Sequence, residues 1–539
     1  MAVFNPYALF VGNQKKRGIG EYKMGVSEKS LDELTKDLVS RRKKALGMGG
    51  PEKLAKRKEQ GVMHARERME YLLDDGTFIE TGLLGEASVN PADKGKTPAD
   101  GKVTGFGKVD GREVAVSVND FTVKGSSTSA TNSKKVGHVR KYATECGMPV
   151  IFVGESTGAR LPDAMGSKGM GALLGNDITQ FQRMRDTPWC AAALGYSFGS
   201  SAWLSCCSDF AVMRKGSTMA VSSPRLISMA IHAEVDLEEL GGWRLHADTT
   251  GLIDLVVDTD EEALEAIKKF LSYMPAHNME APPTEAVTKG SGSEMENIAD
   301  IIPDKRSQVY DVHKIIDAIV DKDSVFEMKR RFGKAVVTCL ARLGGRTVGV
   351  IANNPLHRGG AMDTDACEKC TDFQVMCDSF NIPIVKLVDT PGFIIGVEAE
   401  KKRAPGRIMN FMNSTCLLTV PTLTVIMRKS YGRAYVAMGG GRHSDDLVAW
   451  PSAEVSFMDP RFATRIVHGV EDGDDGYNEA LSEIQQDIEP WDMASIFAVQ
   501  DIIKPEETRD YLIRMLDVYQ LRKTNGVGQH LMRTWPTSY

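Results

Sequence analysis

The stretch GREVAVSV at residues 111–118 leads through a helix-period segment into GMPVIFVGESTG at residues 147–158. The same order returns in GRTVGVIA at residues 345–352 and NIPIVKLVDTPG at residues 381–392. Equivalent positions are 234 residues apart, as in the pairs Arg112 and Arg346, Pro149 and Pro383, and Gly158 and Gly392. No insertion or deletion separates the two copies over this span, so the chain contains the same unit twice.

The segments between these blocks also repeat, as apolar residues spaced i, i+3, i+7 and i+10. The two sets are Val136, Val139, Ala143 and Cys146 in the first copy and Cys370, Phe373, Cys377 and Phe380 in the second. This spacing predicts one apolar face of an amphipathic helix. Since the flanking blocks are short and rich in β-branched residues, each unit reads as strand, helix, strand, which predicts a parallel sheet covered by helices.

A third block extends the repeat, because PWCAAALGYSFGSSA from Pro188 resembles PTLTVIMRKSYGRAY from Pro421. We therefore predict an α/β protein with two homologous domains and an α-helical N-terminal extension, whose first 100 residues include charged, helix-period stretches. A polar segment rich in proline, glycine and serine predicts the linker between the domains. The expected division is residues 1–100 for the extension, 101–280 for the first domain, 281–306 for the linker and 307–539 for the second domain.

The composition fits a soluble enzyme of several domains. The formal net charge of −6 argues against a nucleic-acid binder, which would carry a basic face. The N-terminal sequence has no signal-peptide pattern, and glycines and serines interrupt the most apolar stretch, Trp189 to Leu204, so a strand and turn are expected there instead of a membrane span. Nine cysteines without a regular framework predict reduced thiols in a cytoplasmic protein.

Two kinds of turn are repeated at predicted strand ends, where ligands gather in parallel α/β sheets. The first kind is acidic–hydroxyl–X–Gly, in Glu155–Gly158 and Asp389–Gly392. The second is Ser–aromatic–Gly, in Ser197–Ser200 and Ser430–Arg433. A small-residue turn that opens a helix leaves backbone N–H groups unpaired at a positive dipole end. Such a turn is suited to a developing oxyanion or enolate.

Motifs along most of the chain then resemble one family, the carboxyltransferase (β) subunits of biotin-dependent acyl-CoA carboxylases, of the propionyl-CoA carboxylase β type. The resemblance runs from about residue 40 to residue 470. Its motifs are His64–Arg68, Asp120–Val123, Gly158–Arg160, Glu239–Gly242, Asn353–Pro355, Cys377–Pro383, Asp389–Phe393, Arg428–Gly432 and Ala449–Pro451.

The resemblance implies two crotonase-like domains, of which the first holds acyl-CoA and the second holds carboxybiotin. It implies an active site between the first domain of one subunit and the second domain of its partner, commonly in a hexamer. The implied activity, of the ligase or transferase class, moves CO2 from N1-carboxybiotin to the α-carbon of a CoA thioester. The implied partners are a biotin carboxylase and a biotin carrier, because no biotin-accepting Met–Lys–Met sequence occurs in this chain.

Residue by residue, the resemblance assigns oxyanion donors to both Ser–aromatic–Gly turns. Backbone N–H groups of Gly199 and Ser200 would hold the thioester oxygen, and those of Arg433 and Ala434 the biotin ureido oxygen. Acyl-CoA would contact Ser127, Gly158, Ala159, Arg160 and Val436, and biotin would contact Pro391, Gly392, Phe393, Tyr431 and Gly432. The family usually has Gly–Gly at both turns. The N–H groups survive the changes to Ser200 and Arg433, because every residue except proline carries one.

Other interpretations remain open at this point. The subunit of a biotin-dependent acyl-CoA decarboxylase would run the same half-reaction backwards. A crotonase-like hydratase would need paired carboxylates such as Glu155 and Asp389, and a serine hydrolase would need a histidine and an acid beside Ser200. A non-catalytic assembly subunit is the alternative from another class. No metal site is expected, since Cys367 and Cys370 fall on the apolar helix face and read as core thiols.

Overall fold

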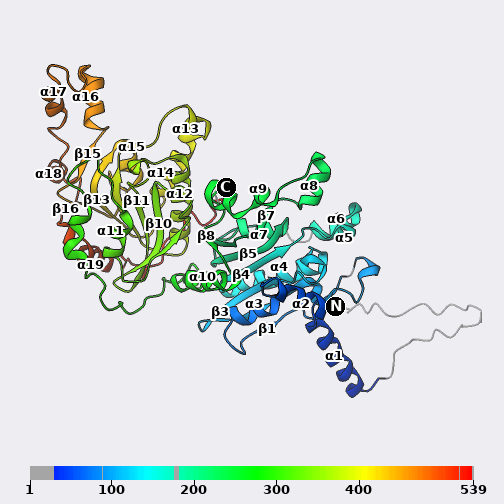
Figure 1. Ribbon diagram of the computed structural model, residues 1–539. Helices are drawn as coiled ribbons and strands as arrows, with labels where there is room; N and C mark the ends of the chain where they lie inside the picture. The colour runs from blue at the N-terminus through cyan, green and yellow to red at the C-terminus, as the bar shows by residue number, and fades with distance from the viewer. Residues whose placement is uncertain (1–28, 88, 175–180, 521, 537–539) are drawn as a thin grey trace, which may run out of the picture.

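The computed structural model describes residues 29–87, 89–174, 181–520 and 522–536, which form two α/β domains joined by a long connection (Figure 1). Residues 1–28 of the predicted helical extension, including the stretch that lacks a signal-peptide pattern, lie outside the described residues. Each domain is built around one eight-stranded sheet, with helices on its faces and at its ends. The fold is therefore the predicted duplication of an α/β unit.

The first sheet has the order β1-β2-β3-β4-β5-β6-β8, with β7 paired to β5. Strands β3 to β6 and β8 run parallel, and β1 and β2 are antiparallel additions at one edge. The strands are β1 (Ile79–Glu80), β2 (Lys102–Val109), β3 (Arg112–Asn119), β4 (Val150–Ser156), β5 (Trp189–Phe198), β6 (Phe210–Arg214), β7 (Thr218–Ala220) and β8 (Leu255–Val257).

The second sheet repeats this topology as β16-β14-β13-β12-β11-β10-β9, with β15 paired to β13. The strands are β9 (Phe326–Met328), β10 (Val336–Leu343), β11 (Arg346–Asn353), β12 (Ile384–Thr390), β13 (Thr422–Tyr431), β14 (Asp446–Ala449), β15 (Glu454–Ser456) and β16 (Asp501–Ile502). The registers match as well. Ser156 pairs with Ser197 at the end of β4 and β5, and Thr390 pairs with Ser430 at the end of β12 and β13.

The helices of the N-terminal region and first domain are α1 (Leu31–Leu46), α2 (Pro51–Glu59), α3 (Ala65–Leu72), α4 (Ala130–Cys146), α5 (Leu161–Ala164), α6 (Gly166–Leu174), α7 (Ser200–Cys206), α8 (Pro224–Ile231), α9 (Leu237–Gly241) and α10 (Asp260–Tyr273). Those of the second domain are α11 (Val312–Ile319), α12 (Thr364–Ser379), α13 (Val397–Lys401), α14 (Ala404–Cys416), α15 (Gly432–Ala437), α16 (Pro460–His468), α17 (Tyr477–Ile484), α18 (Pro490–Ser495) and α19 (Thr508–Gln520). None of the described helices is long and apolar enough to cross a membrane.

The crossover helix predicted in each copy is present as α4 and α12, but the two faces differ in burial. In α12 the whole predicted set is buried, Cys370 and Phe380 included. In α4, Val139 and Ala143 are buried whereas Cys146 is exposed, so the expected apolar face is too long by one turn. Cys146 is the last residue of the helix, directly before the left-handed cap Gly147.

A buried lysine holds the same loop in both domains. The Nζ atom of Lys135 donates to the carbonyl oxygens of Ala99 and Lys102, at 2.6 and 2.5 Å. Its equivalent Lys369, 234 residues later, donates to the carbonyl oxygens of Phe332 and Val336, at 3.2 and 2.8 Å. Burial lowers the pKa of both amines to about 8. The duplication thus extends from the strands to the polar contacts that anchor their loops.

The N-terminal helices are attached to the first sheet by buried ion pairs. Arg57 of α2 contacts both carboxylate oxygens of Glu155 at 2.6 Å, and Arg68 of α3 contacts the same carboxylate at 2.7 Å. Arg68 also reaches Asp260, the first residue of α10, at 2.9 Å. Removing one partner from such a network leaves a buried charge uncompensated, so these contacts fix the predicted helical extension on the domain.

The two domains also share one hydrophobic core. Phe326 of β9 packs against Phe210, Phe270 and Tyr273 of the first domain, with ring centroids 5.4 to 6.4 Å apart. The predicted linker, residues 281–306, is not a free tether, because Met295 and Ile298 within it are buried. This segment therefore packs against the second domain instead of separating it from the first.

The end of the chain returns to the first domain (Figure 1). The guanidinium of Arg185 donates to the carbonyl oxygens of Arg533 and Trp535, at 3.1 and 2.6 Å. His530 contacts Asn381, whose amide donates to the carbonyl oxygen of Asn278. The last described residues thus join a loop of the first domain to the second.

Candidate active site

The first Ser–aromatic–Gly turn lies at the carboxyl end of β5, where the chain enters α7. Gly199 caps this helix with φ 62° and ψ −122°, a conformation that favours glycine, and no side chain caps the helix. The Gly199 N–H donates to the carbonyl oxygen of Ala220 at 3.3 Å, since β7 continues its ladder with β5 here. Ser200 is the first residue of the helix, so its N–H has no partner within the helix.

Thr128 connects this turn to the neighbouring one. Its backbone pairs with the end of β4, as the Thr128 N–H donates to Gly158 and the Arg160 N–H donates to Thr128, both at 2.8 Å. Its hydroxyl lies 2.7 Å from the hydroxyl of Ser200. A Cβ on Gly199 would lie 3.8 Å from the Cα atom of Gly158, so the two turns are in van der Waals reach. No motif in the sequence singles out Thr128.

Two of the residues predicted to contact acyl-CoA, Arg160 and Ser127, are hydrogen-bonded to each other. The Arg160 Nε atom donates to the hydroxyl of Ser127 at 3.1 Å, and its Nη1 atom lies 2.6 Å from Asp100. Both Arg160 and Ser127 are buried, whereas Ala159 between them and the turn is exposed. Their side chains therefore shape the loop, in which Gly158 is buried and Ala159 is exposed.

A cavity of about 340 Å³ opens beside this turn, with Thr128 and Ser200 in its wall. Basic side chains from one face of α4 line it, in the i, i+4, i+7 spacing of Lys134, His138 and Lys141. The same spacing of basic residues is visible in the sequence. Lys102 also lines the cavity, and burial lowers its pKa to about 7. The cavity can therefore hold a ligand that carries negative charge at one end.

The second Ser–aromatic–Gly turn has the same geometry in the second domain. Gly432 takes φ 60° where β13 passes into α15, and this helix also lacks a side-chain cap. The loop after β12 mirrors the first domain, because the Met362 N–H donates to Gly392 at 3.0 Å and the Ile394 N–H donates to Met362 at 2.9 Å. Gly392 and Phe393 thus occupy the places of Gly158 and Ala159.

Among the residues predicted to contact biotin, Tyr431 is buried, whereas the others are partly exposed. Its ring is fully buried, and its hydroxyl bonds to Arg306 and, at 2.7 Å, to Glu454. The whole residue, backbone included, is buried within the chain, so the predicted biotin contact at Tyr431 is not exposed. Pro391 and Gly432 are partly exposed at the edge of the sheet, as is Val436 on α15.

The altered second position of each turn is compatible with the turn. The residues that need positive φ are Gly199 and Gly432, and both are still glycine. Ser200 and Arg433 have negative φ at the start of α7 and α15, where a Cβ is tolerated. The Arg433 side chain is exposed, whereas Ala434 behind it is buried. Both helix starts therefore keep their backbone donors despite the departures from Gly–Gly.

The two acidic strand ends are structural. Glu155 is bound by Arg57 and Arg68, and Asp389 lies 3.0 Å from Arg428 and 3.1 Å from Lys429. Both carboxylates are buried, one in each domain. They form no pair, so the arrangement does not support the hydratase alternative. The hydroxyl of Ser200 contacts Thr128 and no histidine among the described residues, which removes the basis for a serine hydrolase.

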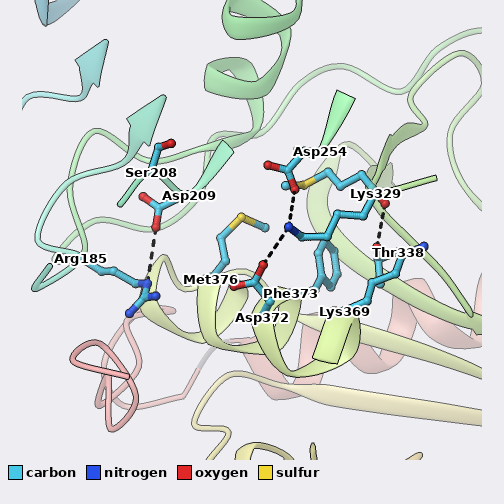
Figure 2. Close-up of a pocket in the computed structure, with 11 residues that line it drawn as sticks. Arg185, Ser208, Asp209, Asp254, Lys329, Thr338, Lys369, Asp372, Phe373 and Met376 are labelled. Atoms are coloured by element: carbon cyan, nitrogen blue, oxygen red, sulfur yellow. Dashed lines mark hydrogen bonds and ion pairs between the residues drawn. The ribbon is translucent and has the colours of Figure 1, made fainter. Parts of the chain in front are cut away.

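A second, smaller cavity of about 20 Å³ lies where the domains join (Figure 2). Lys329 bridges them there, with its Nζ atom 3.4 Å from Asp254 and 3.3 Å from Asp372. Burial raises the pKa of Asp254 to about 6. Burial alone would lower the pKa of Lys329, but the two carboxylates raise it above its usual range. The space suits a single water molecule, so this cluster is a domain joint and not a substrate site.

The cysteines that suggested a metal motif are core thiols. Cys367, Cys370 and Cys377 are buried on α12, and burial raises the pKa of each thiol. All nine cysteines are unpaired. Within the described residues, no group of three or more His, Cys, Asp or Glu side chains is placed to hold a metal ion.

Two eight-stranded sheets share one topology, and in each a positive-φ glycine stands where a strand passes into a helix without a side-chain cap. This arrangement defines a tandem crotonase-like fold. The family of the carboxyl transferase domain matches residues 56–528. The chain belongs to this family, and it is a carboxyltransferase of the biotin-dependent acyl-CoA carboxylases. The predicted family and fold class are confirmed.

Relatives with this fold act in both directions of the chemistry. The chain is 34% identical to the carboxyltransferase subunit of propionyl-CoA carboxylase from Haloferax mediterranei, covering 92% of this chain and 97% of the relative. It is 32% identical to the α subunit of methylmalonyl-CoA decarboxylase from Propionigenium modestum, covering 92% and 96%. The crystal structure of the transcarboxylase 12S hexamer, with methylmalonyl-CoA bound, superposes with a TM-score of 0.86 at 32% identity, covering 92% and 97% of the two chains.

Proposed function

We propose that the chain transfers CO2 from carboxybiotin on a separate carrier protein to the α-carbon of an acyl-CoA. The observation that carries this proposal is the repeated turn: both domains place uncapped N–H groups at a helix start after a positive-φ glycine. The reaction develops two oxyanions, on the thioester and on the biotin ureido group. Two sets of preorganised N–H donors would stabilise these two oxyanions, and no side-chain base is needed.

In the first domain, the N–H of Ser200 is the donor for the thioester oxygen. The expected second donor, the N–H of Gly199, is dropped because it already donates to the carbonyl oxygen of Ala220, and Gly199 instead sets the turn. The cavity beside it supplies room for an acyl-CoA, and the basic face of α4 attracts phosphate groups. Gly158 and Ala159 border the reacting end, while Ser127 and Arg160 hold their loop. Ser127 and Arg160, which were expected to contact acyl-CoA, are thus proposed to support the loop behind the ligand instead.

In the second domain, the N–H groups of Arg433 and Ala434 are the donors for the ureido oxygen. Pro391, Gly392 and Phe393 border the biotin ring, and Val436 faces the acyl group. The α7 and α15 turns lie well apart within one chain (Figure 1). A complete site therefore requires the first domain of one subunit and the second domain of another, which supports a homo-oligomer such as a hexamer.

The proposed partners are a biotin carboxylase and a biotin carrier, with the ligase activity belonging to the whole assembly. A cytoplasmic location is proposed from the nine unpaired cysteines, which suit a reducing compartment. The decarboxylase direction is the second candidate, because two of the similar proteins are methylmalonyl-CoA decarboxylase α subunits.

The test is a half-reaction with the purified full chain. Malonyl-, methylmalonyl- and branched carboxyacyl-CoA thioesters are supplied with biotin amide, and acyl-CoA release is followed by chromatography. Release that depends on biotin supports the transferase. No release from any thioester by an intact oligomer would overturn it and favour an assembly subunit. Coupling to a biotin carboxylase and ATP then separates the carboxylase from the decarboxylase.

A further inference from the structure

A cavity of about 470 Å³ lies above the carboxyl ends of the second sheet, and its lining is strongly cationic. Eleven residues line it, of which one is acidic, Asp459, and five are basic: Lys305, Arg306, Arg428, Lys429 and Arg461. Pro391, which borders the proposed biotin ring, also lines it. The cavity is thus continuous with the edge of the biotin side of the site.

Two guanidinium groups in this lining, that of the buried Arg428 and that of the partly exposed Arg306, each have one buried N–H group without an acceptor among the described residues. Arg428 is 4% exposed, and it uses Nε for Asp389 and Nη1 for the carbonyl oxygen of Gln308. Its Nη2 atom has no acceptor among the described residues. Arg306 directs Nη2 toward Tyr431, Glu454 and Asp459, while its buried Nε atom also has no acceptor among them. Each of these N–H groups therefore lacks an acceptor among the described residues, beside a cavity large enough to hold one.

The charge around the cavity stays positive when every neighbouring carboxylate is counted. Asp389 is shared by Arg428 and Lys429, and Glu454 and Asp459 both contact Arg306. These three carboxylates face five cations, which leaves two positive charges uncompensated. A cavity with that balance and with forked guanidinium donors recognises a carboxylate.

The first domain has no such lining at the equivalent strand positions. Arg428 and Lys429 correspond to Gly195 and Tyr196, because Ser430 of β13 is the counterpart of Ser197 of β5. The strand after the acidic turn therefore carries cations only in the second copy, whereas in the first copy Arg57 and Arg68 of the N-terminal helices bind the equivalent carboxylate, Glu155. This difference matches the two substrates of the proposed reaction, since the thioester group is neutral and carboxybiotin is an anion.

We propose that this cationic cavity binds the carboxylate of carboxybiotin before transfer, with Arg306 and Arg428 as its guanidinium contacts. The proposal rests on the proposed function. When the N1–C bond breaks, CO2 leaves and the electron pair remains on the ureido group, so the negative charge moves from the cavity to the oxyanion turn. The cavity holds the carboxylated form, and the turn holds the form produced by transfer.

Equilibrium binding to the full chain tests this assignment without turnover. The probes are biotin amide and its N1-carboxymethyl derivative, a stable compound with a carboxylate near the N1 position. Wild-type protein is expected to prefer the carboxymethyl compound. Arg306→Gln should weaken its binding about tenfold and leave biotin amide within about twofold. Arg306→Lys keeps the charge and should recover part of the preference. Arg465→Gln, an exposed residue of α16 outside the cavity, is the matched control.

Equal binding of both probes by the wild type, or equal losses for both probes in Arg306→Gln, would overturn the carboxylate assignment. A variant that fails to fold is recognised from its circular dichroism, and Lys305→Gln, which removes an exposed cation, then replaces it with the same expected direction. The transfer assay with CoA thioesters is scored separately. A preference for the carboxylated probe in a chain that transfers no CO2 would refute the proposed function and leave the cavity assignment standing.

Discussion

Replacing Ser200 with proline removes one oxyanion donor while preserving the helix that carries it. Ser200 is the first residue of α7, where the helix makes no use of the N–H and the φ of proline is already suitable. Gly199 before it is outside the α region, as a residue preceding proline prefers. The cost to stability is the lost hydroxyl contact with Thr128, about 1 kcal/mol. The expected loss in kcat is about 10²–10³-fold, the usual effect of one missing donor.

Ser200→Ala is the matched control, because it removes the same hydroxyl and keeps the N–H. Its kcat should stay within about fivefold of the wild type, the equivalent of one neutral hydrogen bond. Both variants are assayed for release of acyl-CoA with biotin amide, and the urea midpoint confirms that they fold. A folded Ser200→Pro with unchanged kcat would refute the donor assignment. Equal damage in Ser200→Ala would assign the effect to the hydroxyl instead. Gly199→Pro is a poorer test, since φ 62° excludes proline altogether.

Three further outcomes are expected. Burial lowers the pKa of Lys386 to about 7, whereas an unfolded lysine titrates near 10.4. Lys386→Met should therefore raise the free energy of unfolding by about 2–4 kcal/mol at pH 7, and this gain should vanish as the pH approaches 10. A difference in urea midpoint that does not depend on pH would contradict this. Glu155→Gln should lower the free energy of unfolding by about 3–5 kcal/mol, because Arg57 and Arg68 lose their charged partner. The folded variant should keep the kcat of the wild type, and a hundredfold loss of kcat would instead favour the hydratase alternative. Arg433→Ala keeps its backbone N–H and should retain kcat within about fivefold, and a larger loss would assign the chemistry to the guanidinium.

The duplication was predictable because strands and crossover helices leave periodic patterns. Residues 111–158 and 345–392 align without a gap, and the structure repeats even the pairing of Ser156 with Ser197 in that of Thr390 with Ser430. The antiparallel edge of each sheet was not predicted. Short strands such as β1 and β9 contain two and three residues, too few to show a period.

The roles of charged residues were harder to predict, because they depend on contacts between distant segments. Arg57 and Glu155 are 98 residues apart, and no local pattern joins them. Arg160 was expected to bind acyl-CoA, yet its partner Asp100 lies 60 residues earlier. The basic face of α4 is local, so its spacing could have been read directly from the sequence.

The positions of the two Ser–aromatic–Gly turns at strand ends were predictable, but their tolerance of Ser200 and Arg433 was not. That tolerance depends on which residue of each turn takes positive φ. The sequence shows only that one glycine of the usual pair is missing. The structure shows that Gly199 and Gly432 keep the demanding conformation, so the replaced positions are ordinary helical ones.

The contact between Arg185 and the end of the chain imposes an order on biosynthesis. The hydrogen bond from Arg185 cannot form until Trp535, which is 350 residues later, has been synthesised. At the usual pace of translation, about 5–20 residues per second, this interval is roughly 18–70 s. The first sheet can form on the ribosome, but Arg185 lacks these two acceptors until residues 533–535 have been synthesised. A change that displaces residues 533–535 would therefore act late, on a first domain that is otherwise already folded.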